Sequence, residues 1–144
     1  MTKPYNGIQP VAPAAFHPDG SLDADGNHRI LECMIDQKVD GICVLANYSE
    51  QFLLSDAERD QLTRLSLEHI NGRVPVMVTI SPFATDIVME RARQCKAVGA
   101  DIVMMIPPIV GSVERHSRTK LRASRPIWRG WSADYAAGCL FIQD

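Results

Sequence analysis

The sequence lacks several patterns by which other classes of protein are recognised. No apolar run approaches the roughly 18 residues that a membrane-spanning helix needs. Residues 1–10 show no basic stretch followed by an apolar run, so we expect no secretory signal. The net charge of −2 gives the chain as a whole no attraction for nucleic acid or acidic membranes. We therefore expect a cytoplasmic protein without a nucleic-acid or membrane partner.

Metal-binding and redox patterns are missing as well. The four cysteines form no Cys-X-X-Cys pair, and Cys33, Cys43 and Cys95 each lie within an apolar stretch. We interpret these three as reduced thiols in or near the core, not as a zinc site or a disulfide framework. The four histidines lack the mutual spacing of metal ligands, and we expect neither a metal ion nor a cofactor.

What the sequence has is an alternation of two kinds of segment over its first 108 residues. Short apolar runs predict strands buried on both faces, as in a parallel sheet. These runs span residues 8–11, 41–45, 74–80 and 101–106. Between them, apolar residues at spacings of three and four predict amphipathic helices. These helices span residues 28–37, 56–70 and 85–98, and the stripe of the third includes Ile87, Val88, Ala92, Cys95 and Val98.

The residues that flank the helices agree with these boundaries. Ser55 and Glu58 have the spacing of a capping box that begins the second helix. Asn71-Gly72 ends that helix, and Gly99 follows the third as a C-terminal cap. One strand and one helix together take about 30 residues, which is the size of a βαβ unit.

Two architectures use such units, and the sequence favours one of them. A doubly wound sheet carries a glycine-rich loop after its first strand, but residues 10–16 contain no glycine. A barrel instead places its chemistry at the carboxyl ends of its strands. The unusual residues lie there, at 47–50, 81–83 and 107–108. We predict a partial (β/α)8 TIM barrel over residues 1–111, with about four of its βα units, because a whole barrel takes about 250 residues.

The composition changes after residue 111. Up to that point nine Lys/Arg stand against fourteen Asp/Glu, whereas residues 112–144 hold six against three. Both tryptophans, Trp128 and Trp131, lie in this second segment, and we find no alternation of strand and helix there. A basic arm with aromatics for nucleic acid is one interpretation. We favour an irregular tail that is aberrant or disordered, produced for example by a frameshift or an alternative exon.

Several short strings carry a family resemblance. They are Asp40–Leu45, Leu54–Arg59, Gly72–Val76, Gly99–Asp101 and Pro107-Pro108. In this order and spacing, they resemble the dihydrodipicolinate synthase and N-acetylneuraminate lyase family over residues 7 to 108. The resemblance implies a (β/α)8 barrel and class I aldolase or dehydratase chemistry through a Schiff base.

The segment after the second strand identifies a branch of that family. Most members read Gly-Thr-Thr-Gly-Glu there and hold the carboxylate of a pyruvate-like substrate, whereas this chain has Ala46–Glu50. The run resembles the branch that dehydrates 2-keto-3-deoxy sugar acids such as 2-keto-3-deoxy-L-arabonate. It implies that Asn47, Tyr48 and Ser49 bind a small-molecule 2-keto acid. The alternatives are turn chemistry for Asn47 and Ser49, and packing for Tyr48.

Two departures from the family bear on catalysis. The tyrosine that relays protons after the Pro-Pro pair is replaced by Ile109–Gly111. The Schiff-base lysine of strand six has no counterpart, since Lys120 cannot be matched to it. We therefore expect a lyase by family that is truncated before its nucleophile, holds no catalytic residue and is inactive alone.

Two other functions stay open. A pyruvate-dependent aldolase of the synthase type is disfavoured by Ala46 and Tyr48. A non-enzymatic remnant or partner-binding fragment is the third hypothesis, because half a barrel leaves strand edges uncovered and prone to association. For the intact family fold, the resemblance implies a homo-oligomer.

Overall fold

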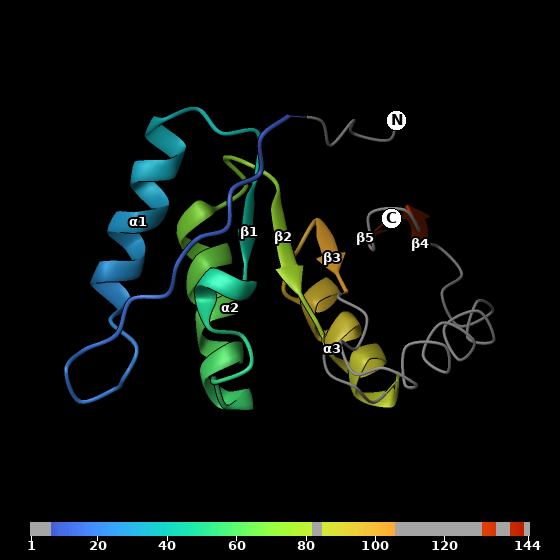
Figure 1. Ribbon diagram of the computed structural model, residues 1–144. Helices are drawn as coiled ribbons and strands as arrows, with labels where there is room; N and C mark the ends of the chain where they lie inside the picture. Colours follow the sequence, from blue (N-terminus) through green and yellow to red (C-terminus); the bar gives the residue numbers. More distant parts are fainter. Residues whose placement is uncertain (1–6, 82–84, 106–130, 135–138, 143–144) are drawn as a thin grey trace.

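The computed structural model describes residues 7–81, 85–105, 131–134 and 139–142 (Figure 1). Its helices are α1 (Ala24–Asp36), α2 (Asp56–Ile70) and α3 (Thr85–Ala97), with a short 3-10 turn η1 (Asn47–Ser49). Its strands are β1 (Ile42–Val44), β2 (Val76–Thr79), β3 (Ile102–Met104), β4 (Trp131–Asp134) and β5 (Cys139–Ile142). None of the helices described here is long and apolar enough to cross a bilayer.

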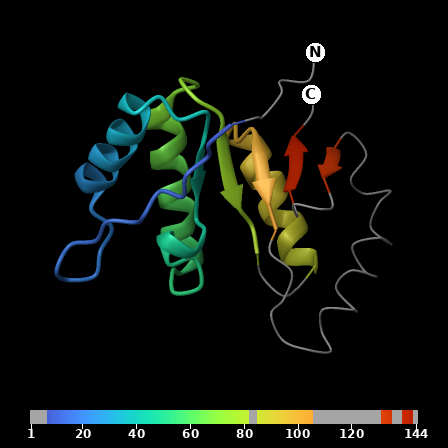
Figure 2. The same cartoon turned by 45° about the horizontal axis from the view of Figure 1, so that its top comes forward.

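The first part of the sheet is parallel, as predicted. β1 pairs with β2 and β2 with β3, so that Met77 stands between Cys43 and Ile102. Each strand is joined to the next by a helix, and the views in Figures 1 and 2 show β1, β2 and β3 side by side. This is the βα alternation of a barrel, although each strand is shorter than its apolar run.

The predicted strand at residues 8–11 is reduced to a single bridge, in which Val11 pairs with Cys43 in parallel. The Cys43 amide donates to the Pro10 carbonyl at 2.9 Å, and the Ala12 amide donates to the Cys43 carbonyl at 2.8 Å. Pro10, which faces β1, has no N–H group to donate to the ladder, and this prevents the pairing from extending toward the amino terminus.

Two strands were not predicted. β5 pairs antiparallel with β3, and β4 pairs antiparallel with β5, giving the order β1-β2-β3-β5-β4. The edge of β3, which we expected to be uncovered, therefore has a partner. Only four apolar residues form β5, too few to reveal a strand within a stretch that lacks periodicity. The predictions for residues 107–130, including the basic stretch, lie outside the described residues.

The core lies between the sheet and the helices. The side chains of Ile42, Val44, Val76, Val78 and Val103 are buried together with one stripe from each helix. These stripes contain Leu31, Leu62, Ile70, Val88 and Ala92. The prediction that Ile87 belongs to the stripe of α3 was wrong, since 48% of it is exposed. Successive helical residues point 100° apart, so only Val88 of this adjacent pair faces the sheet.

Local side chains set the helix boundaries. The predicted capping box of α2 is confirmed, with Ser55 Oγ accepting from the Glu58 amide and Glu58 accepting from the Ser55 amide. Asn71 (φ 46°) and Gly99 (φ 91°) take the left-handed conformation that ends a helix. α1 begins four residues earlier than predicted, because Asp23 caps it by accepting from the Gly26 amide at 2.8 Å.

Candidate functional site

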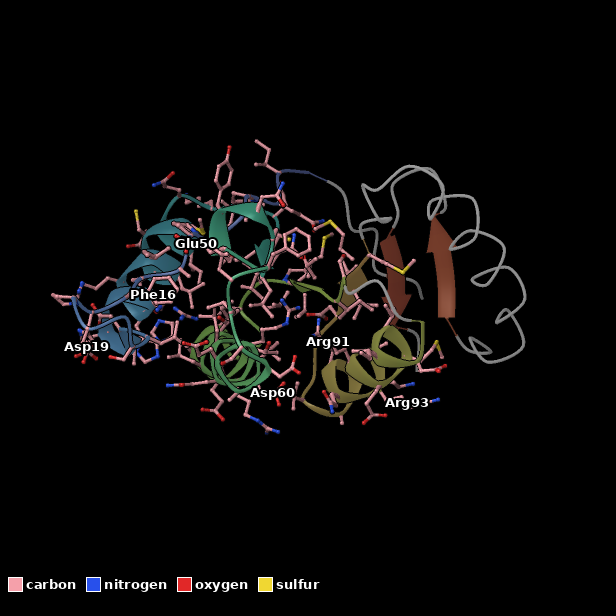
Figure 3. The ribbon with its side chains drawn as sticks, turned by 60° about the horizontal axis from the view of Figure 1, so that its bottom comes forward. Phe16, Asp19, Glu50, Asp60, Arg91 and Arg93 are labelled. Atoms are coloured by element: carbon pink, nitrogen blue, oxygen red, sulfur yellow. The ribbon has the colours of Figure 1, made fainter. Side chains whose placement is uncertain are left out.

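The predicted substrate-binding residues lie on the loop that follows β1, at the carboxyl edge of the parallel sheet. This loop, Ala46–Gln51, contains the turn η1, and Figure 3 shows Glu50 at its end. Leu45 (φ 59°) and Glu50 (φ 53°) bracket it in the left-handed region. That conformation is costly for side chains of this size and persists where surrounding contacts hold it, commonly at binding sites.

Ser49 fixes the loop through hydrogen bonds on its buried side. Its side chain is 1% exposed, and its hydroxyl donates to the Ala12 carbonyl at 2.6 Å. Its amide donates to the Ala46 carbonyl at 3.0 Å. The hydroxyl proton is therefore used within the fold, which leaves only its lone pairs for a ligand.

Asn47 and Tyr48 face outward from the same turn. Both side chains are exposed, Tyr48 by 74%. Asn47 Oδ1 accepts from Gln51 Nε2 at 3.1 Å, while no acceptor among the described residues is found for the Asn47 NH2 group. Within the described part of the chain, no acceptor is found for the backbone amides of Asn47 and Tyr48. The turn thus presents several N–H donors at the edge of the sheet.

Sequence reasoning missed the buried arginine beneath this loop. Arg59, in the first turns of α2, is 5% exposed. Its Nη1 donates to the Gln51 carbonyl at 2.7 Å and its Nη2 to the Thr79 carbonyl at 2.9 Å. Burial, with Arg91 nearby, lowers the pKa of Arg59 to about 10. A signal was present, since Arg59 precedes Leu62 and Thr63 by three and four residues and so shares their inward face.

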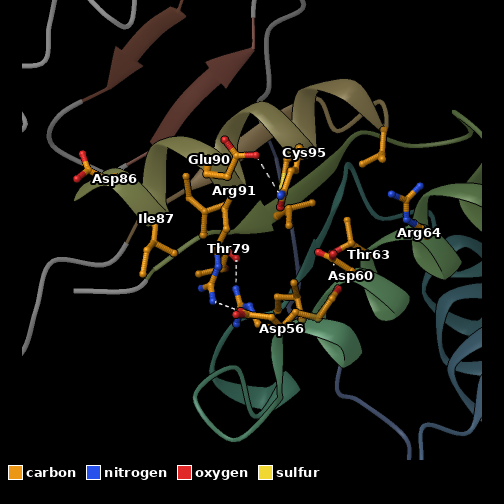
Figure 4. Close-up of a pocket in the computed structure, with 16 residues that line it drawn as sticks. Asp56, Asp60, Thr63, Arg64, Thr79, Asp86, Ile87, Glu90, Arg91 and Cys95 are labelled. Atoms are coloured by element: carbon orange, nitrogen blue, oxygen red, sulfur yellow. Dashed lines mark hydrogen bonds and ion pairs between the residues drawn. The ribbon is translucent and has the colours of Figure 1, made fainter. Parts of the chain in front are cut away.

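A groove of about 480 Å³ separates α2 from α3 on the helical side of the sheet. Asp56 and Arg91 form an ion pair across it (Figure 4). Cys95 lines its floor, where burial raises the pKa of the thiol to about 11. The groove is distinct from the Ala46–Gln51 loop, although Arg59 and Thr79 contribute to its lining.

The remaining predicted residues fall in three groups. Ser81 is 6% exposed at the end of β2, while Pro82, Phe83, Pro107, Pro108 and residues 109–111 lie outside the described residues, as does Lys120. Cys33 is exposed, which corrects its prediction as a thiol in or near the core, because it lies on the outer face of α1. Cys43 and Cys95 are buried, as expected.

Two of the described histidines, on α1 and α2, contact each other. His28 and His69 stack with ring centroids 4.2 Å apart, and His69 Nε2 is 2.7 Å from Glu32 Oε1. In the described ranges no three His, Cys, Asp or Glu side chains are grouped so as to hold a metal ion. Lys38 and Lys96 lie near the carboxyl ends of α1 and α3, at the edge of the sheet where the strands begin.

Known proteins resemble both the sequence and the fold. The dihydrodipicolinate synthetase family matches residues 4–118. L-2-keto-3-deoxyarabonate dehydratase of Azospirillum brasilense is 46% identical over 114 residues, which are 79% of this chain and 37% of that protein. 4-Hydroxy-tetrahydrodipicolinate synthase of Stenotrophomonas maltophilia is 34% identical over 103 residues, covering 72% of this chain and 35% of the synthase.

The fold also matches solved structures over a similar part of their chains. The structure of YagE, a prophage protein of Escherichia coli K12 solved in complex with pyruvate, superposes with a TM-score of 0.76 at 25% identity. The match covers 86% of this chain and 43% of YagE. The chain thus spans little more than a third of the length of the curated relatives it matches. The parallel βα units, the loop after β1 and these similarities agree, and the chain belongs to the dihydrodipicolinate synthetase family.

Proposed function

We propose that the Ala46–Gln51 loop binds the carboxylate of a 2-keto acid, as part of a lyase that dehydrates a 2-keto-3-deoxy sugar acid such as 2-keto-3-deoxy-L-arabonate. The observation that carries the proposal is that the backbone amides of Asn47 and Tyr48 and the side-chain NH2 group of Asn47 have no acceptor among the described residues. A carboxylate that accepts from several N–H groups makes strong, charge-assisted hydrogen bonds. The substrate class is supported by the relative that is 46% identical and named as a dehydratase of that acid.

The three predicted residues have different parts in this proposal. Asn47 donates from its side chain, and the Tyr48 ring forms a wall beside the turn. Ser49, whose hydroxyl is already donated to Ala12, fixes the turn from the buried side. Leu45 (φ 59°), just before the loop, supports the proposal because a left-handed leucine persists where surrounding contacts hold it, whereas the left-handed Glu50 is the C-cap of η1.

We propose further that this chain alone forms no Schiff base. An amine must reach the keto carbon of the bound acid to condense with it. Both described lysines, Lys38 and Lys96, lie at the opposite edge of the sheet from the loop. The chain would then retain a binding element of the lyase without its nucleophile.

For the intact protein we propose a homo-oligomer in the cytoplasm. Phe52 and Leu53, next to the loop, are 55% and 79% exposed, and an apolar surface of this kind is suited to contact with another subunit. Cys33, Cys43 and Cys95 form no disulfide, and a reducing compartment would keep their thiols in that state.

Pyruvate with borohydride tests the proposed function. Titration of the labelled chain with pyruvate should shift the amide resonances of Asn47 and Tyr48. Subsequent borohydride should leave the protein mass unchanged, because the described lysines, Lys38 and Lys96, lie at the opposite edge of the sheet from the loop. Nuclear magnetic resonance and intact-protein mass spectrometry supply the two readouts.

The control compares alanine substitutions of two amide side chains, one in the loop and one outside it. Asn47→Ala should reduce the shifts, whereas Gln61→Ala, an exposed position on α2, should leave them as they are. Resonances that do not respond to pyruvate would refute binding at the loop. A stable adduct on any lysine would refute the absence of Schiff-base chemistry.

A further inference from the structure

The Ala46–Gln51 loop is held on both sides by side chains that reach backbone carbonyls of neighbouring βα units. On one side, the Ser49 hydroxyl donates to Ala12, which follows the Val11 bridge. On the other, Arg59 donates to Gln51 within the loop and to Thr79 at the end of β2. The loop is therefore tied to the segment before it and to the strand after it.

The second tie depends on the shape of the arginine side chain. A guanidinium presents planar, diverging N–H groups, so one side chain can bridge two carbonyls from separate elements. A lysine ammonium is a single point of charge and reaches such a pair less well. Arg59 is thus the one described side chain that joins the end of the loop directly to the end of β2.

The buried charge of Arg59 makes the free energy of folding less favourable. A buried cation loses its hydration, and neutral carbonyls restore only part of the lost free energy. The ionisable groups of the two helices that act electrostatically on Arg59 are Asp56, Asp60, Arg91 and Cys95, and Asp56 is already paired with Arg91. None of the described carboxylates forms an ion pair with Arg59. An apolar side chain would suit packing alone, so the guanidinium points to another role.

Two left-handed residues, one just before the loop and one within it, indicate that role. Leu45 and Glu50 hold left-handed conformations that need support from surrounding contacts. Glu50 directly precedes Gln51, whose carbonyl accepts from Arg59. Fixing that carbonyl therefore restricts the end of the turn that carries Asn47 and Tyr48.

We propose that Arg59 is a positioning residue, whose two hydrogen bonds hold the Ala46–Gln51 loop in register with the end of β2 and so align the donors of Asn47 and Tyr48. The assignment of these donors to a 2-keto acid rests on the proposed function. The positional role of Arg59 concerns the loop itself and can be measured without a ligand.

Amide hydrogen exchange of the full chain measures that role directly. Arg59→Met should raise exchange of the loop amides that donate within the turn, Ser49 and Glu50, relative to the core of α2. The expected increase is about tenfold or more, the factor that follows from losing a hydrogen bond from a charged donor. Arg59→Lys keeps the charge but lacks the diverging N–H groups, so its loop exchange rate should lie between those of the unaltered chain and Arg59→Met. Leu62→Ala is the matched control, because Leu62 is a buried apolar residue of the same helix. It should raise exchange in the loop and the helix alike.

Two further measurements separate positioning from general stability. Guanidinium ion at millimolar concentration should restore slow exchange to Arg59→Ala, but not to Leu62→Ala, by occupying the vacated site. Pyruvate should bind Arg59→Met about tenfold more weakly than it binds the unaltered chain if the loop is misaligned. In Leu62→Ala, exchange should increase equally in the loop and in α2. The same equal increase in Arg59→Met and Arg59→Lys would overturn the assignment of Arg59 as a positioning residue.

The two proposals fail in different ways. An unaltered chain that does not bind pyruvate would refute the keto-acid site, while the exchange ratio would still decide the role of Arg59. If Arg59→Met does not fold, Arg59→Lys and guanidinium rescue of Arg59→Ala decide it. Failure of both to distinguish loop from helix would refute positioning.

Discussion

Two side chains of the same type differ in accessibility in this fold according to how deeply each is buried. Cys33 and Cys95 both lie on helices, at exposed and buried positions respectively. Burial raises the pKa of the Cys95 thiol to about 11, since the thiolate is poorly solvated there. At pH 8 the reactive thiolate is therefore scarce at Cys95, and access is blocked as well.

Iodoacetamide at pH 8 should accordingly modify Cys33 much faster than Cys95 in the folded chain. Peptide mapping after timed quenching gives the rate at each site. In urea the two rates should converge, because unfolding returns both thiols to water. Equal rates in the folded chain would contradict the buried position of Cys95.

At the candidate site, the sequence predicts where residues lie but not which contacts they make. The position of Asn47, Tyr48 and Ser49 after a strand could be predicted from the apolar run before them. The use of the Ser49 hydroxyl could not, because its partner Ala12 is 37 residues away and serine suits a turn and a ligand cradle equally. Arg59 was missed because a charged side chain is rarely fully buried.

At the scale of the element, α2 has the best-defined start of the helices described. Ser55 and Glu58 satisfy two amides that a helix N-terminus would otherwise leave without partners. The hydrogen bonds from Ser55 also hold the pKa of the Glu58 carboxyl below its usual value. Helix boundaries of this kind are predictable because the interacting residues are three positions apart.

Ser55→Ala should lower the free energy of unfolding by about 1 kcal/mol, the usual effect of losing an N-terminal cap. Urea denaturation followed by circular dichroism measures the change. Ser55→Asp is the control, because aspartate accepts from the same amide and should retain most of the stability. An unaltered midpoint for Ser55→Ala would mean that the cap contributes nothing to α2.

Strands were harder to predict than helices, for reasons that differ between strands. Apolar runs locate β1, β2 and β3, but pairing decides where each strand ends. The segment at 8–11 pairs only at Val11 because of its neighbouring prolines. β5 pairs antiparallel with β3, in which even the nearest partners, Met104 and Cys139, are far apart in the sequence, and β4 in turn pairs with β5. A pairing between such distant segments leaves no local pattern.

At the scale of the whole molecule, stability depends on the layer between the sheet and the three helices. Leu31, Ile42, Ile70 and Val78 are each no more than 2% exposed there. By contrast, Tyr48 in the loop after β1, and Phe52 and Leu53 directly after that loop, lie at the surface. Truncating a leucine should therefore have an effect that depends on which of these two regions contains it.

Leu62 and Leu53 make a matched pair for this test, since one is 4% and the other 79% exposed. Leu62→Ala should lower the free energy of unfolding by about 2–5 kcal/mol, through lost burial and the cavity left behind. Leu53→Ala should change it by no more than about 0.5 kcal/mol. Urea titration compares the two, with trimethylamine N-oxide added to keep Leu62→Ala folded at the start of the titration. Equal losses would mean that the loop packs into the core, and a small loss for Leu62→Ala would mean that the helices do not form one layer with the sheet.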